Sequence, residues 1–135
     1  MVAQLRNSLI SVCLLSFAAV VFAEPSGSWR ERVPEKESAR ANPFQNDPQA
    51  VLAGAKMFQQ HCASCHGKQG EGKGKKPSLH TDRVRNSTPG ELQWLLRNGS
   101  LIVGMPSWSR LPEQQRWQIV AYLKNLESTP DRPQQ

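Results

Sequence analysis

The hydrophobic positions of this chain fall into three stretches that have the spacing of amphipathic helices. In the first, between residues 48 and 61, small or apolar side chains recur at i, i+3, i+4 and i+7: Val51, Gly54, Ala55 and Phe58. Asp47 is a favourable N-cap for this stretch, and Pro48 suits a first helical position. The pattern therefore predicts a helix that begins beside Asp47 and runs into a pair of cysteines.

The other two stretches lie in the C-terminal half of the chain. Residues 88–91 read Thr-Pro-Gly-Glu, which has the form of a capping box, and a glycine at position 99 ends this helix. Its apolar face is formed by Leu92, Leu95 and Leu96. The last helix is predicted from residue 112 to about residue 127, with an apolar side made of Ile119, Tyr122, Leu123 and Leu126. No segment alternates like a strand, so we expect an all-α domain of three to four short helices, with loops over 67–87 and 100–110.

The two ends of the chain have a different composition. Residues 1–23 join a basic start to a short apolar run that finishes in Val21-Phe22-Ala23, and this order predicts a secretory signal peptide. An uncleaved membrane anchor is the alternative for the same run, although the run is short for a membrane span. Residues 24–46 are rich in Pro, Ser and charged side chains and are predicted to form a flexible leader. For the last residues of this leader, an arm packed on the domain through Trp29 or Phe44 is an equal alternative. This division leaves residues 47–127 as the domain and residues 128–135 as a disordered tail.

The charge of the chain is moderately basic. Seventeen Lys and Arg stand against 11 Asp and Glu, for a formal net charge of +6, which is not the excess expected of a nucleic-acid-binding protein. The densest basic run consists of Lys68, Lys73, Lys75, Lys76, Arg83 and Arg85. Such a run serves either as a docking surface for an acidic partner or simply as a solvated loop.

The chemistry of the chain is concentrated in residues 62–66, Cys-Ala-Ser-Cys-His. This C-x-x-C-H sequence is the attachment signature of c-type haem. Two cysteines three positions apart can bond to the two vinyl groups of one porphyrin edge, and the histidine that follows can bind the iron. A covalent cofactor would also stabilise a domain whose helices carry few large apolar side chains. The competing interpretations are a thioredoxin-like redox pair, which needs a βαβ context, a zinc site, which needs four ligands, and a structural disulfide.

Residues 47–127 resemble a class I (mono-haem) cytochrome c domain of the bacterial periplasmic type. In that family the haem motif closes an N-terminal helix, and this helix crosses a C-terminal helix. Gly54 and Phe58 match the glycine and aromatic residue that the family uses at this crossing, and Ile119 and Tyr122 match their partners. The resemblance therefore implies a small cytochrome c fold around one covalently bound haem c.

The resemblance also implies the residues that hold the haem. Cys62 and Cys65 would attach it, His66 would be the proximal iron ligand, and Met105 in Gly104-Met105-Pro106 would be the distal one. His80 is the main competitor for the distal position, and Met57 is a weaker one. The carbonyl of Pro77 would accept a hydrogen bond from the second ring nitrogen of the proximal histidine. Trp108 would line the haem or reach a propionate, as would Trp94, unless both only pack in the core.

This interpretation predicts an electron-transfer protein rather than an enzyme. We expect one haem c with His/Met ligation to shuttle single electrons between periplasmic redox partners, such as a dehydrogenase and a terminal oxidase or reductase. Docking would use the basic surface near the haem edge, without nucleic acid and without stable membrane insertion after signal cleavage. The alternatives are the cytochrome subunit of a larger dehydrogenase complex, and a haem-based sensor or peroxidase-like enzyme with a labile distal ligand.

Overall fold

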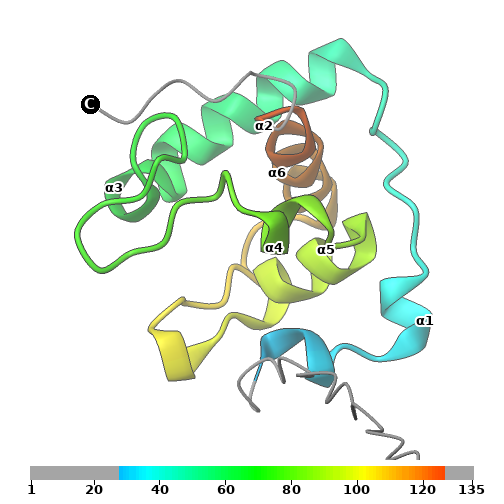
Figure 1. Cartoon of the computed structure of the whole chain (residues 1–135). Coiled ribbons are helices and arrows are strands. Elements are labelled where there is room, and N and C mark those ends of the chain that lie inside the picture. Colours follow the sequence, from blue (N-terminus) through cyan, green and yellow to red (C-terminus); the bar gives the residue numbers. More distant parts are fainter. Residues whose placement is uncertain (1–27, 127–135) are drawn as a thin grey trace, which may run out of the picture.

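The computed structural model describes residues 28–126, and the regular secondary structure of this part of the chain is helical, with two isolated β-bridges in its loops. Its elements are η1 (Trp29–Arg32), α1 (Glu35–Ser38), α2 (Pro48–His61), α3 (Ala63–His66), α4 (Asp82–Arg85), α5 (Pro89–Asn98), η2 (Leu101–Val103) and α6 (Glu113–Leu126). The predicted all-α class is confirmed. Within residues 28–126, the three long helices α2, α5 and α6 are those that the sequence pattern predicts, whereas α1, α3 and α4 are single turns (Figure 1).

The long helices begin and end where their capping residues stand. The Asp47 side chain accepts a hydrogen bond of 2.9 Å from the Gln49 amide at the start of α2. At the start of α5, Thr88 and Glu91 form the predicted capping box: the Glu91 amide donates to the Thr88 hydroxyl, and the Thr88 amide donates to the Glu91 carboxylate. Gly99 ends α5 with a φ of +70°, a conformation that favours glycine.

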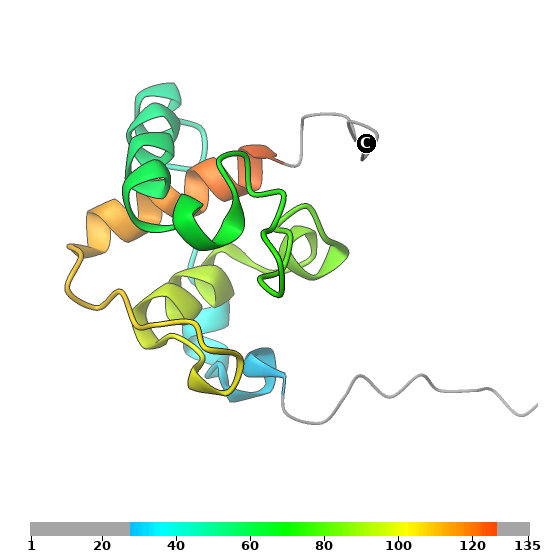
Figure 2. The same ribbon diagram turned by 90° about the vertical axis from the view of Figure 1, so that its left-hand side faces the viewer.

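The crossing of α2 and α6 organises the domain (Figures 1 and 2). A Cβ atom built on Gly54 would lie 1.9 Å from the carbonyl oxygen of Gln118, so only glycine allows the two backbones to approach this closely. One turn further along, the rings of Phe58 and Tyr122 pack with centroids 5.2 Å apart and a tilt of 52°. The predicted crossing, with Gly54 and Phe58 on one helix and Tyr122 on the other, is present.

The buried face of α2 differs slightly from the predicted one. Ala50, Gly54 and Phe58 are buried, whereas Val51 and Ala55 are only half-buried. The buried residues form a row with a spacing of four, because that row is the one that lies along α6. Around the crossing, the large core side chains come from α2, α5 and α6: Phe58, Leu92, Leu96, Trp117, Ile119, Val120 and Leu123.

The N-terminal arm, residues 28–46, is folded onto the domain. Asn42 is buried, and its side-chain amide donates a 2.9 Å hydrogen bond to the Trp117 carbonyl of α6. Gly90 of α5 lies so close to the arm that a Cβ on it would be 1.9 Å from the carbonyl oxygen of Glu37. Both Trp29 and Phe44 pack against the core. The flexible leader predicted for residues 24–46 is therefore wrong for this part, and the alternative of a packed arm describes it.

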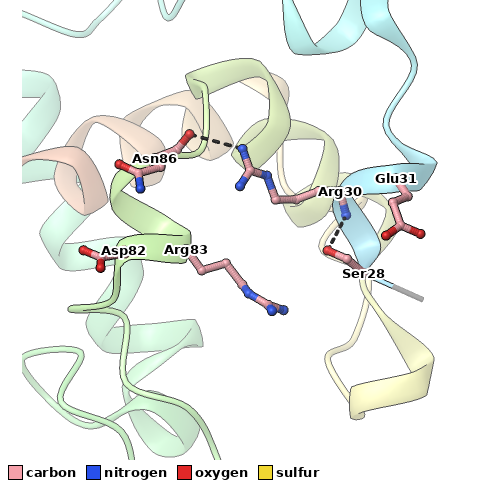
Figure 3. Close-up of a pocket in the computed structure, with 6 residues that line it drawn as sticks. All are labelled: Ser28, Arg30, Glu31, Asp82, Arg83 and Asn86. Carbon is pink, nitrogen blue, oxygen red and sulfur yellow. Dashed lines mark hydrogen bonds between the residues drawn. The ribbon is translucent and has the colours of Figure 1, made fainter. Parts of the chain in front are cut away.

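The arm also encloses a shallow polar hollow with α4 (Figure 3). The guanidinium of Arg30 donates to the Asn86 carbonyl at 3.2 Å and to the Glu91 carboxylate at 3.3 Å. These bonds tie the arm to Asn86, just after α4, and to the first turn of α5. The hollow thus lies where the N-terminal arm meets α4.

The predicted signal peptide (residues 1–23), the first residues of the leader and the predicted tail (128–135) lie outside the described residues. Between residues 28 and 126, no helix combines the length and the apolar character needed to cross a membrane.

Candidate cofactor site

The cysteine motif forms one tight turn at the end of α2. Cys62 caps α2, and its carbonyl accepts hydrogen bonds from the amides of Cys65 (3.1 Å) and His66 (2.9 Å). This turn is α3, and Gly67 ends it with a φ of +82°. The two thiols and the imidazole are therefore held on a single rigid turn that is continuous with the helix crossing.

Both thiols of this turn are free. Cys62 is half-buried and Cys65 is exposed. Burial, together with repulsion from the neighbouring Cys65, raises the pKa of the Cys62 thiol to about 11. The two groups are thus not joined in the disulfide that is one alternative for the motif. Between residues 28 and 126, no cluster of three or more His, Cys, Asp or Glu side chains could hold a metal ion, so the zinc alternative finds no support there.

The imidazole of His66 is oriented by the loop that follows it. Its Nδ1 donates a hydrogen bond of 3.0 Å to the carbonyl oxygen of Pro77, which is the bond that the resemblance implies. A carbonyl can only accept, so the proton is on Nδ1 and the lone pair of Nε2 is left to bind a metal. The loop itself is fixed by the Gly72 amide, which donates to the His66 carbonyl at 2.7 Å.

His80, the competing distal ligand, belongs to the same loop. Its Nε2 lies 2.8 Å from the carbonyl oxygen of Gln69 and donates to it, and its own amide donates to the Ser78 hydroxyl. The imidazole therefore ties the two ends of the loop together. A role as an iron ligand through Nε2 would break this bond.

Met105 stands in a separate loop that is closed by two glycine turns. Gly99 and Gly104 both have a φ of +70°, and between them the chain folds back so that Ser100 and Met105 exchange two backbone hydrogen bonds of 2.8 and 2.9 Å. Met105 is half-buried and packs against the core. The rest of this loop is anchored by the Trp108 amide, which donates to the Leu96 carbonyl of α5 at 2.8 Å.

Trp108 also links this loop to the cysteine motif. Its ring lies 5.3 Å from that of His61, the residue just before Cys62. The α3 turn, the loop after it and the Met105 loop all lie on the side of the molecule that faces the viewer in Figure 2. The His61–Trp108 contact was not predicted, because nothing in the sequence signals a pairing across 47 residues. Trp94, the other tryptophan considered for the haem, is half-buried on α5.

The predicted basic run is divided between the loop after α3 and the short helix α4. Lys73 and Lys75 are exposed in the loop after α3, whereas Arg85 is paired with Asp82 on α4 at 3.0 Å. Lys76 is half-buried, and its amine lies 3.4 Å from where a Cβ of Gly104 would stand. This lysine therefore reaches from the loop after α3 to the Met105 loop.

A C-x-x-C-H turn that closes the first of two helices crossed at a glycine is the arrangement of class I cytochrome c domains, and the chain is a domain of this class. The family described as "Cytochrome C oxidase, cbb3-type, subunit III" matches residues 49–123, which is more than half of the chain. The chain belongs to this family. No curated protein matches it.

A solved structure has a similar fold. It is cytochrome cL from the marine methylotrophic bacterium Methylophaga aminisulfidivorans MPT, with a TM-score of 0.56 and 25% sequence identity. The similarity covers 63% of this chain and 58% of that one, so the chain matches little more than half of the solved cytochrome. The N-terminal arm precedes the family match, which begins at residue 49.

A cytochrome c domain carries covalently bound haem c, and the residues present fit that group. The free thiols of Cys62 and Cys65 stand three positions apart on one turn, His66 presents Nε2, and Met105 offers a thioether.

Proposed function

We propose that this protein carries single electrons through one haem c, attached by Cys62 and Cys65 and ligated by His66 and Met105. The observation that carries the proposal is the hydrogen bond from His66 to Pro77, because it fixes the tautomer and the ring orientation that iron ligation needs. The haem, when bound, supplies a one-electron iron couple. The chain's own residues hold, orient and tune that group.

Each of these residues has a distinct role in the proposal. The two cysteines keep the cofactor attached while it changes charge. Pro77 makes the His66 imidazole a more basic ligand, and the thioether of Met105 favours the reduced iron, so that the His/Met pair raises the potential. Two axial ligands close the iron, which suits an electron carrier rather than an enzyme that must bind a substrate. Trp108 holds the Met105 loop near the cysteine motif through its contact with His61.

The working environment that we propose is the periplasm. The N-terminal sequence supports export through a cleaved signal peptide. The redox partners are a periplasmic dehydrogenase as donor and a terminal oxidase or reductase as acceptor. The oxidase subunit named in the family description supports an acceptor of this kind.

The test is the visible spectrum of the mature protein made in cells that attach haem c. We expect sharp low-spin bands that do not change with carbon monoxide. Met105→Ala should open the iron to carbon monoxide and lower the midpoint potential, whereas His80→Ala, the control for the competing ligand, should leave the spectrum unchanged. An unchanged spectrum in Met105→Ala would show that Met105 is not a ligand, and absence of haem from the wild type would refute the proposal as a whole.

A further inference from the structure

The loop that carries Met105 has an apolar tip that is largely exposed in the part of the chain that the structure describes. Its three residues Leu101, Ile102 and Val103 are 87%, 75% and 67% exposed, and they form the one-turn helix η2. In Figure 1 this yellow turn stands out from the body of the molecule. Exposure of three consecutive apolar residues is unfavourable in water, and such a surface is typical of an interaction site.

The fold holds this tip in place. Gly99 and Gly104 frame it, each with a φ of +70°, and the paired backbones of Ser100 and Met105 close its base. Met105 packs against the core, whereas the three tip residues are exposed. The loop therefore directs the thioether inward and presents the three apolar side chains outward.

Cationic side chains stand at the base of the tip. The guanidinium of Arg32, from the N-terminal arm, donates to the Ser100 hydroxyl at 3.4 Å. On the other side, the amine of Lys76 lies beside Gly104. An apolar centre with a charged rim is the composition of a protein–protein interface, and a positive rim selects a negative one.

We propose that the tip, residues 101–103, docks into an apolar recess edged by carboxylates on a redox partner protein. The inference rests on the proposed function, because the tip lies within four residues of Met105 and docking there would bring a partner to the iron's ligand loop. A membrane surface is the other conceivable occupant, but the tip is a single turn and lacks the long amphipathic helix typical of interfacial anchors.

The experiment uses gold surfaces coated with alkanethiols as a chemically defined substitute for the partner. One coating carries only carboxylates, and the other mixes carboxylates with methyl groups. Adsorption of the haem-loaded protein is followed by mass on a quartz microbalance, so the result does not depend on electron flow. The variants are the triple Leu101→Ser/Ile102→Ser/Val103→Ser and, as a matched control, Leu52→Ser, which removes another exposed apolar side chain, on α2.

We expect the wild type to bind the mixed coating about tenfold more tightly than the carboxylate coating, since burying even one large apolar side chain is worth that much. The triple variant should lose this preference, and Leu52→Ser should keep it. Lys76→Gln should weaken binding to both coatings and reduce its salt dependence.

Three results would overturn the inference. The triple variant could bind like the wild type, in which case the tip makes no contact. A tip-dependent association with phosphatidylglycerol vesicles would replace the protein partner by a membrane. A changed haem spectrum in the triple variant would make the tip part of the haem pocket. A haem iron that is high-spin and binds carbon monoxide in the wild type would instead refute the proposed function, and the adsorption of the haem-loaded protein would still report on the tip.

Discussion

Replacing Gly54 by alanine tests the helix crossing on which the whole site depends. The added Cβ would stand 1.9 Å from the carbonyl oxygen of Gln118 and 3.0 Å from the Cβ of Tyr122. The first of these neighbours is main chain and cannot rotate away. The two helices must therefore move apart by roughly 1 Å, and a gap of that size forfeits about a quarter to a half of the dispersion energy of each contact across the crossing.

The expected free-energy change combines two opposing effects. Overpacking of this kind destabilises by about 1–3 kcal/mol, with backbone clashes at the upper end. Alanine also favours a helix over glycine by about 1 kcal/mol, which offsets part of the loss. We expect a net loss of about 2 kcal/mol, which for a domain of this size lowers Tm by roughly 10 °C.

The assay is urea and thermal unfolding of the haem-loaded protein, with Leu52→Ala on the exposed side of α2 as control. The control should change stability by less than about 0.5 kcal/mol. The sign of the effect is decisive, because helix propensity alone predicts that Gly54→Ala is more stable than the wild type. An equal or higher Tm in this variant would refute the close crossing at Gly54.

Two further substitutions test the arm and its ion pair. Asn42→Ala should cost about 1–3 kcal/mol, because it removes two hydrogen bonds of a buried side chain, one to the Trp117 carbonyl and one from the Phe44 amide. The exposed Asn46→Ala should change the urea midpoint little, and equal effects of the two substitutions would mean that the arm is not packed. Glu113 accepts hydrogen bonds from Arg40 and Trp117, and chiefly the Arg40 bond holds the pKa of its carboxyl below the usual value. The stability that this carboxylate contributes is therefore present above about pH 4 and is lost as the pH falls further. Glu113→Gln should be less stable than the wild type at pH 7 by less than about 1 kcal/mol, and its stability should fall less steeply with acid. Identical profiles of stability against pH in the two proteins would contradict this.

The parts of the fold that could be predicted from the sequence are those that depend on near neighbours. The helices α2, α5 and α6 each carry a regular apolar spacing, and for α2 and α5 a capping residue marks the start. The single turn α4 is not predicted, although Thr81 caps it by accepting a bond from the Val84 amide, because four residues are too few to show a period. The same limit explains why the sequence predicts a loop where η2 stands.

The arm escapes prediction for a different reason. Its composition is polar, and its key bond joins Asn42 to a residue 75 positions away in the sequence. A polar residue that satisfies a buried carbonyl looks in the sequence like any other polar residue in a linker. The close approach of the arm to α5 has one signal in the sequence, which is Gly90. That glycine also has a second explanation, because it stands in the first turn of α5.

The candidate site shows the same division. The spacing of Cys62, Cys65 and His66 is local, so the sequence alone is enough to predict the attachment turn. The partner of the His66 ring lies 11 residues away, and its carbonyl belongs to the backbone, so only the resemblance to a family could name it. The exposed tip is not predicted because Leu, Ile and Val in a short loop are expected to be buried, and exposure is a property of the folded chain.

The folded domain is larger than the region that the family match covers. The family match begins at residue 49, yet the arm before it packs on the core with Trp29 and Phe44 and donates a hydrogen bond to the carbonyl of Trp117. Arg32 of the same arm holds Ser100, whose backbone is paired with that of Met105. The arm is therefore connected to the loop of the proposed distal ligand through one hydrogen bond and one bridge.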